Sequence, residues 1–273
     1  MEVKIDLRRS LPENASFYYE RAKKAKGKIA GAEKAIKETL EKIGKLSGEA
    51  PPAERRVVLK ERKAKKWFEK FRWFESSDGF LVLGGRDATS NEVLVKKHLE
   101  ANDLVFHADF HGAPFFIVKN ADGRDIPDAT KREAAEAAGS YSRAWAGGSG
   151  SCDIYYVNPE QVSKTPPAGE YLTKGAFMIY GRKNYIRGVE LKIAVGFIVG
   201  ESVEVIGGPV SAISKRTRHY AVLGVGDMKS GELARRIKAA VMGKAGKEDA
   251  EKLKSVGLGG IQYWIPGGKG RLL

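Results

Sequence analysis

Cysteine is almost absent from this sequence of 273 residues, which contains only Cys152. A single cysteine excludes both a disulfide framework and a zinc site built from cysteines. No run of 18 apolar residues is present, so a membrane-spanning helix is not expected. Charged side chains occupy the first ten positions, where a signal peptide needs an apolar segment, and we therefore expect a cytoplasmic protein. The sequence also lacks a Walker-type phosphate loop, a dinucleotide-binding glycine motif and a serine nucleophile elbow.

Positive charge, in contrast, is abundant and unevenly distributed. The chain has 48 Lys and Arg against 34 Asp and Glu, a net charge of +14. Residues 1–72 carry +10, residues 73–150 carry −4 and residues 151–273 carry +8. A basic protein of this kind most often binds a polyanion, and nucleic acid is the commonest one inside cells. The charge therefore predicts nucleic-acid contacts on the first and last blocks, although a basic surface without a partner is the alternative.

The first block has the pattern of a coiled coil. Between residues 22 and 46 small and apolar side chains recur at alternating spacings of three and four, which is a heptad seam. Glycine and proline at residues 48–52 end this helix, and a second basic helical stretch covers residues 53–71. We predict an antiparallel coiled-coil hairpin over residues 1–72. A solvated pair of charged helices is the alternative interpretation.

The remainder has the pattern of an α+β fold. Short apolar runs bounded by turn residues predict strands at residues 80–83, 104–106, 115–118, 154–157, 177–180 and 191–199. Helical periodicity predicts helices at residues 88–99 and 128–145, the second capped by Asp128 or Thr130. Because no regular alternation of strand and helix is present, we expect a mostly antiparallel sheet flanked by helices over residues 73–200. Residues 201–273 are expected to form an α/β extension packed on it.

A glycine pair marks the first candidate site. Gly84 and Gly85 follow a strand and precede Arg86, Asp87 and Asn91. Glycine lets the backbone turn and approach a ligand closely, and Arg86 would then hold a phosphate or a base edge. The alternative is a pairing of Arg86 with Asp87 that only shapes the turn.

His107, Asp109 and His111 form the second candidate. Alternate residues of an extended strand share a face, so these three side chains would suit a metal ion. The alternative is a turn whose polar side chains satisfy the local backbone. Because no further histidine or carboxylate cluster accompanies them, we expect no metal and no cofactor.

The third candidate is a region in which basic and aromatic residues alternate. Cations would bind phosphates and rings would stack on bases, which is what single-stranded or looped RNA requires. The alternative is an ordinary basic hairpin with tyrosines at the edge of the core. The residues concerned are Lys164, Tyr171, Lys174, Arg182, Lys183, Tyr185 and Arg187.

Several of these segments together resemble the RNA-binding (NFACT-R) domain of the NFACT family. The resemblance rests on residues 78–87, on Asn91-Glu92, on residues 107–109, and on residues 161–172 and 175–185. Residues 14–26 are similar to the start of the coiled-coil arm of that family, and the part after Val199 is similar to an archaeal-type C-terminus.

The resemblance implies a role in ribosome-associated quality control. Its expected partners are rRNA of the obstructed large ribosomal subunit, tRNA or peptidyl-tRNA, and quality-control proteins bound through the coiled coil. The family's N-terminal domain and helix-hairpin-helix module have no counterpart here, so we expect a module that binds RNA and helps recruit tRNA for template-free tailing without being an enzyme.

The expected RNA contacts join all three candidate regions. Two other functions stay open from the residues alone. One is a metal-dependent RNA-processing enzyme that uses His107, Asp109 and His111, and the other is a coiled-coil scaffold for proteins. The expected RNA-binding residues are Arg86, Asp87, Asn91, His107, Asp109, Lys164, Tyr171, Lys174, Arg182, Lys183, Tyr185 and Arg187.

Overall fold

The computed structural model divides the chain into two units, residues 1–63 and 64–273. It describes residues 10–15, 66–110, 112–165 and 172–273, together with positions 18, 19, 22, 26, 29, 33, 36, 38 and 39. In the first unit the described positions from residue 11 onward are helical, as expected for the first helix of the hairpin. The rest of the expected coiled-coil hairpin, including most of its second helix, lies outside the described residues.

The second unit contains a six-stranded sheet in the order β1-β2-β4-β3-β5-β8, in which every neighbouring pair is antiparallel. Successive side chains of a strand point to opposite faces, so Val105 and Phe106 enter two different cores. The strands are β1 (Arg72–Glu75), β2 (Leu81–Gly84), β3 (Leu104–Ala108), β4 (Phe116–Val118), β5 (Ser151–Val157) and β8 (Asn184–Glu190).

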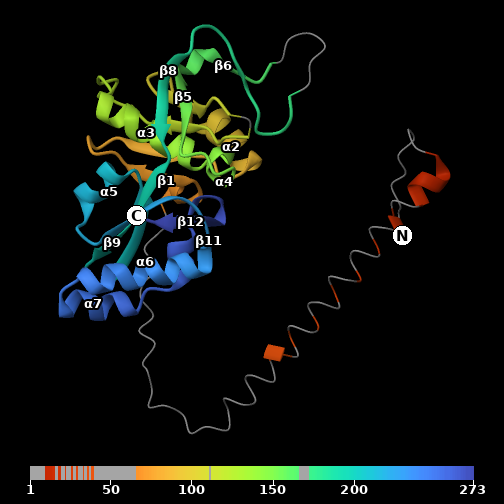
Figure 1. Ribbon diagram of the computed structural model, residues 1–273. Helices are drawn as coiled ribbons and strands as arrows, with labels where there is room; N and C mark the ends of the chain where they lie inside the picture. Colours follow the sequence, from red (N-terminus) through yellow and green to blue (C-terminus); the bar gives the residue numbers. More distant parts are fainter. Residues whose placement is uncertain are drawn as a thin grey trace. The chain divides into compact units, whose positions relative to one another are not determined.

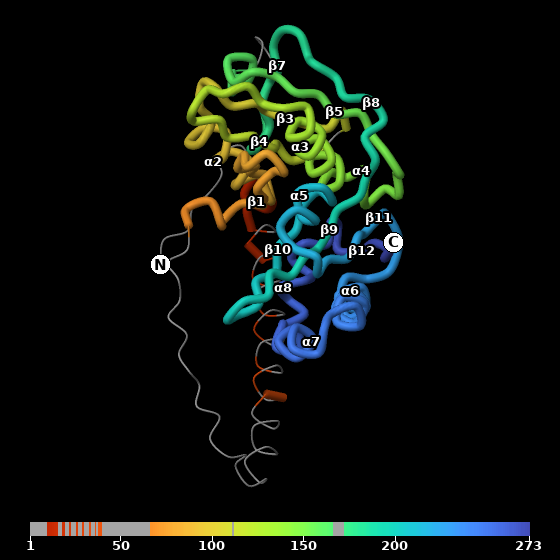
Figure 2. Tube along the Cα trace, turned by 90° about the vertical axis from the view of Figure 1, so that its left-hand side faces the viewer, coloured from red at the N-terminus to blue at the C-terminus, as the bar shows by residue number. Residues whose placement is uncertain are grey.

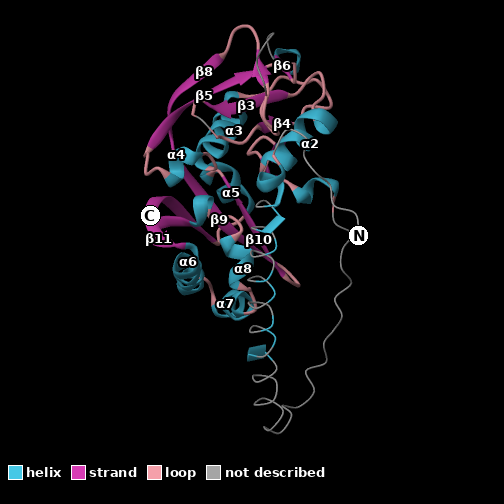
Figure 3. Cartoon of the chain, turned by 90° about the vertical axis from the view of Figure 1, so that its right-hand side faces the viewer, coloured by secondary structure: helices cyan, strands magenta, loops and turns pink. Residues whose placement is uncertain are grey.

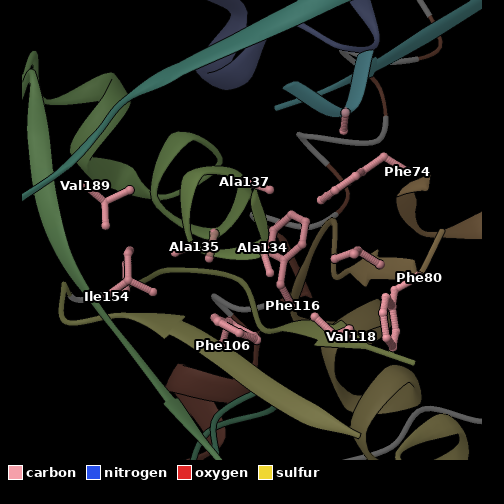
Figure 4. Close-up of a cluster of buried hydrophobic side chains, with 14 of the residues drawn as sticks. Phe74, Phe80, Phe106, Phe116, Val118, Ala134, Ala135, Ala137, Ile154 and Val189 are labelled. Atoms are coloured by element: carbon pink, nitrogen blue, oxygen red, sulfur yellow. The ribbon is translucent and has the colours of Figure 1, made fainter. Parts of the chain in front are cut away.

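Helix α3 (Asp128–Ser140) covers one face of this sheet. Four of its alanines, residues 134, 135, 137 and 138, are fully buried, and small side chains let the helix approach the sheet closely. Figure 4 shows this cluster, in which Phe106 and Phe116 of the sheet lie below the helix. Helix α2 (Ala88–His98) and the small hairpin of β6 (Val162–Ser163) and β7 (Met178–Ile179) pack on the opposite face, which carries the candidate site.

A second antiparallel sheet has the order β10-β9-β11-β12. Helix α6 packs on one face, where Leu233 and Ile237 meet Phe197, and helix α5 packs on the other through Ile213 (Figures 2 and 3). None of the described helices is both long and apolar enough to cross a bilayer. The elements are β9 (Lys192–Val199), β10 (Val203–Gly208), α5 (Val210–Arg216), β11 (Tyr220–Lys229), α6 (Ser230–Lys244), α7 (Lys247–Lys254), α8 (Leu258–Gln262) and β12 (Lys269–Leu272).

Strands β8 and β9 are separated by Leu191 alone and run as one ribbon through both sheets (Figure 1). The prediction that residues 191–199 complete the first sheet was wrong, because β9 pairs with β10 and β11. The apolar pattern of a strand predicts burial but does not identify its hydrogen-bonding partners. The α+β class with antiparallel sheets and flanking helices is confirmed.

The helix expected over residues 128–145 is two helices. It stops after Ser140, and the Ser142 hydroxyl accepts a hydrogen bond from the Ala144 amide at the start of α4 (Arg143–Ala146). Neither expected cap is used, since the residue before α3 is Pro127 and Thr130 instead donates to Asp78 at 2.8 Å. The buried break matters because it directs Arg143 away from the axis of α3 and toward the candidate site.

Candidate nucleic-acid interface

A cavity of about 480 Å³ opens on the face of the first sheet that carries α2. We call it the arginine pocket. It is lined by the turn before α2 and the first turn of that helix, by β3 and the turn after it, by residues 173–177, and by the junction of α3 and α4. Arg72 of β1 and Tyr155 of β5 complete the lining. Five of the twelve residues expected from the sequence lie here, namely Arg86, Asp87, Asn91, His107 and Lys174.

Two of these residues build the turn that presents Arg86. The Asp87 carboxylate accepts hydrogen bonds from the amide and hydroxyl of Ser90, at 2.7 and 2.9 Å, and caps helix α2. The Ser90 hydrogen bonds lower the pKa of Asp87. Asn91 is buried, and its side-chain oxygen accepts from the Phe115 amide at 3.2 Å. Asp87 thus caps the helix without pairing with Arg86, whose guanidinium lies 4.7 Å from the centre of the Tyr263 ring.

Four cations line the arginine pocket, and among the described residues none of them has a carboxylate partner. Arg86 and Lys174 were expected, whereas Arg72 and Arg143 were not. The Arg72 guanidinium lies 4.2 Å over the Tyr141 ring and donates to the Tyr263 carbonyl at 3.4 Å. Unpaired cations beside the N-terminal end of α2 make the pocket attractive to anions. Arg72 follows an aromatic run and Arg143 follows an alanine-rich helix, so neither carried a local signal of binding.

His107 supports the pocket wall. Its Nε2 lies 3.1 Å from the Ala113 carbonyl, an acceptor, so this nitrogen carries the hydrogen. Burial lowers the pKa of His107 and keeps the imidazole neutral. Asp109 is exposed and accepts a 3.4 Å hydrogen bond from the Tyr185 hydroxyl. His111 lies outside the described residues, which contain no group of three His, Cys, Asp or Glu side chains able to hold a metal.

Lys164 holds the loop beside the pocket. Its ammonium group pairs with Glu92 at 3.1 Å and donates to the carbonyls of Thr173 and Ala176. The same Glu92 carboxylate accepts from the Gly175 amide at 2.8 Å. The ammonium group of Lys164, one of the expected RNA contacts, is therefore already paired within the protein. Tyr171, another expected contact, lies outside the described residues.

We expect Glu92→Gln to weaken the fold in a pH-dependent way. Hydrogen bonds from Lys96, Gly175 and Lys164, in that order, lower the pKa of Glu92 from 4.5 to about 2. A depressed carboxyl pKa stabilises the folded state above the unfolded pKa, and this contribution is lost as the pH falls from 4.5 through 2. The difference in urea midpoint between wild type and Glu92→Gln should accordingly be largest near pH 7 and shrink toward pH 2.5.

Glu160→Gln is the matched control, because the Glu160 carboxylate forms no ion pair among the described residues. Its urea midpoint should follow that of the wild type at every pH. A Glu92→Gln difference that stays constant across the titration would contradict this role of the carboxylate.

A second basic cluster (Arg182, Lys183 and Arg187) lies on β8, the edge strand of the first sheet, and on the two residues just before it. The Lys183 ammonium group lies 4.3 Å over the Tyr155 ring, and the exposed Arg187 lies 4.0 Å over the Tyr185 ring. Arg187 also pairs with Asp153 at 2.5 Å. The ring of Tyr155 lines the arginine pocket as well, so it joins the pocket to β8. Arg182 is also exposed.

The segment Tyr263-Trp264, which directly follows helix α8, supports the pocket. The Tyr141 hydroxyl donates to the Trp264 carbonyl at 3.0 Å, and the Tyr263 hydroxyl donates to the Phe71 carbonyl at 3.1 Å. The Tyr263 ring lies beneath Arg86 and its carbonyl accepts from Arg72. Tyr263, far away in the chain, therefore orients Arg72 and Arg86. The sequence analysis did not predict this contact.

Residues 70–181 match the family model of the NFACT protein RNA binding domain. This part of the chain belongs to the NFACT family. Every residue that lines the arginine pocket falls within the matched range, whereas Tyr263 and the second sheet fall outside it. The NFACT domain thus contains the whole lining of the pocket but not all of its support.

Two similar proteins show where the similarity lies. The chain is 38% identical over 202 residues to the archaeal Rqc2 homolog aRqcH of Methanocaldococcus jannaschii, covering 74% of this chain and 30% of that protein. It is 41% identical over 191 residues to the human ribosome quality control complex subunit NEMF, covering 68% of this chain and 17% of that protein. The chain thus spans less than a third of the length of either relative.

Among solved structures, the C-terminal part of the fibronectin/fibrinogen-binding protein of Streptococcus suis aligns with 67% of this chain and 77% of that one. The TM-score is 0.38 and the sequence identity is 22%, a similarity too low to support a conclusion about this chain.

Proposed function

We propose that the chain is an RNA-binding module that acts in ribosome quality control. One observation carries the proposal: four cations without carboxylate partners among the described residues line a pocket inside the NFACT RNA-binding domain. Arginine binds phosphate with two parallel hydrogen bonds, and cations left unpaired by the fold are free to do so. The names of the archaeal and human relatives support the process in which the module acts.

We further propose the partners. The module binds rRNA of the obstructed large ribosomal subunit together with peptidyl-tRNA and helps recruit tRNA for template-free tailing. It does so in the cytoplasm as a binding module without catalytic activity of its own. Residues 1–72, as a coiled-coil hairpin, would contact other quality-control proteins. Support for these finer points comes from the family resemblance and from the positive charge of the chain.

Exchange of Arg182 and Lys183 for glutamate tests the contribution of the β8 cluster. The slope of log K against log salt is negative, and each lost phosphate contact reduces its magnitude by about one. We therefore expect the magnitude of the slope to fall by about two and the affinity to drop about tenfold. The measurement is cosedimentation with purified large ribosomal subunits at several salt concentrations, followed by crosslinking that identifies the bound RNA.

The control carries the same change of charge elsewhere. Arg235→Glu with Lys244→Glu alters two exposed residues of α6, on the second sheet and away from the pocket lining. This control should sediment like the wild type. Unchanged sedimentation of the Arg182 and Lys183 variant would remove these two residues from the interface, and absence of cosedimentation for the wild type would overturn the proposed function.

A further inference from the structure

We propose that the arginine pocket receives one unpaired nucleotide, with its phosphate on the arginines and its base against the aromatic wall. This inference rests on the proposed RNA-binding function and specifies which form of RNA the site selects. The pocket would then bind looped, bulged or terminal nucleotides in preference to paired ones.

The dimensions of the cavity support a single nucleotide. A volume of about 480 Å³ lies within the range of about 300–1,000 Å³ that is usual for small-ligand sites. A double helix presents its phosphates on the outside and its bases stacked within, so only an unstacked nucleotide enters a hollow of this size. A cavity of this volume is too small for a duplex and large enough for a base with its ribose and phosphate.

The pocket wall has a cationic part and an aromatic part, which match the phosphate and the base of a nucleotide. Arg72, Arg86 and Arg143 supply guanidinium groups for a phosphate, and Lys174 adds a fourth positive charge. Tyr141 and Phe177, both half-buried, supply aromatic surface for a base, and the buried Phe115 and Tyr155 lie in the wall beside them. Among the described lining residues Asp87 is the only carboxylate, and its hydrogen bonds to Ser90 commit it to the helix cap. A partner with both a flat aromatic part and an anionic part fits this combination.

Contacts within the protein also hold the pocket wall in place. Gly175 has φ of +79°, and a Cβ at this position would lie 2.6 Å from the Cα of Ala88, so the loop rests directly on the first turn of α2. The contacts of Lys164 and Glu92 hold the same loop. A preformed site loses little conformational entropy when it binds. Tyr155 leads from the pocket to Lys183, which places a cation where the strand of a bound nucleotide would continue.

Two fluorescent RNA hairpins test the inference. They share one sequence, but one carries a single unpaired 2-aminopurine as a bulge and the other pairs that residue. We expect the bulged hairpin to bind at least about tenfold more tightly, because stacking of one base on aromatic side chains contributes that much. We also expect the 2-aminopurine fluorescence to change when the protein is added to the bulged hairpin. Affinity is measured by fluorescence anisotropy of a separate end label.

A variant that fills the pocket without removing charge sharpens the test. Ala88 lines the pocket and is exposed, so Ala88→Phe should abolish the preference for the bulge without removing any charge. Ala121→Phe, at an exposed turn outside the pocket, is the matched control and should retain the preference. Thr173→Phe fills the pocket from the opposite loop and replaces Ala88→Phe if circular dichroism shows that the latter is unfolded.

The outcomes separate the two proposals. Equal binding of both hairpins by the wild type, or a folded filled-pocket variant that keeps the preference, overturns the unpaired-nucleotide site and leaves RNA binding intact. Failure of the wild type to bind either hairpin overturns the proposed function itself.

Discussion

Simultaneous replacement of Arg86 and Arg143 by glutamate is expected to lower the affinity for RNA about a hundredfold. Both residues line the arginine pocket, are exposed and have no carboxylate partner among the described residues, so their charges are available to a phosphate. Loss of two charge-assisted contacts accounts for a change of this size, and the introduced carboxylates add repulsion. The salt dependence should weaken too, with the slope of log K against log salt reduced by about two.

The variant with Arg235 and Lys244 replaced by glutamate again serves as the control, since it has the same net charge and an intact pocket. Fluorescence anisotropy titrations with a bulged hairpin at several salt concentrations measure both quantities. If the two variants lose equal affinity, the whole charge of the protein and not the pocket determines binding, and the pocket would have to be abandoned as the site.

Gly85→Ala is expected to lower the free energy of unfolding by about 3 kcal/mol, the largest effect on stability that we predict. A Cβ at Gly85 would lie 1.7 Å from the side-chain oxygen of Asn91. Asn91 is buried and accepts from the Phe115 amide, so it cannot move aside without leaving that amide unpaired. Overpacking and the loss of a buried hydrogen bond each destabilise a fold by about 1–3 kcal/mol.

Urea denaturation measures the free energy of unfolding of Gly85→Ala, and Gly150→Ala is the matched control. A Cβ at Gly150 would meet no heavy atom within 4 Å and the φ of this residue is not positive, so its exchange for alanine should change the stability by less than about 0.5 kcal/mol. Equal stability of the two variants would show that Asn91 does not hold the turn rigidly. A stable Gly85→Ala protein with weakened RNA binding would show that the glycine serves the ligand alone.

Local patterns were sufficient to predict most strands and helices of the second unit. Short apolar runs placed β2, β3 and β4 within a residue or two, and the helical spacing placed α2. Strand β8 was missed because its outward face carries Tyr185, Arg187 and other polar residues on an edge strand, which weakens the apolar signal. The assignment of β9 failed for a different reason, since pairing between strands depends on contacts that are distant in the sequence.

The candidate site was predictable only in part, because residue type does not reveal pairing. Lys164 and Arg187 look like Lys174 and Arg182 in the sequence, yet the first two are paired with Glu92 and Asp153. Arg86 was found because a glycine pair marks its turn, whereas Arg72 and Arg143 reach the pocket through the fold alone. No sequence motif surrounds Tyr263. It contacts Arg86 and Arg72 only because the fold brings this distant segment to the pocket.

The continuity of β8 and β9 determines where this protein can be divided. The family match ends at residue 181, three positions before β8 begins. A chain severed there would lose β8, and the amides of β5 that β8 now satisfies would be left as an open edge, a surface on which sheets of different molecules join. It would also lose Tyr263 from beneath Arg86. The range that matches the family model is therefore shorter than the part of the chain that we expect to fold by itself.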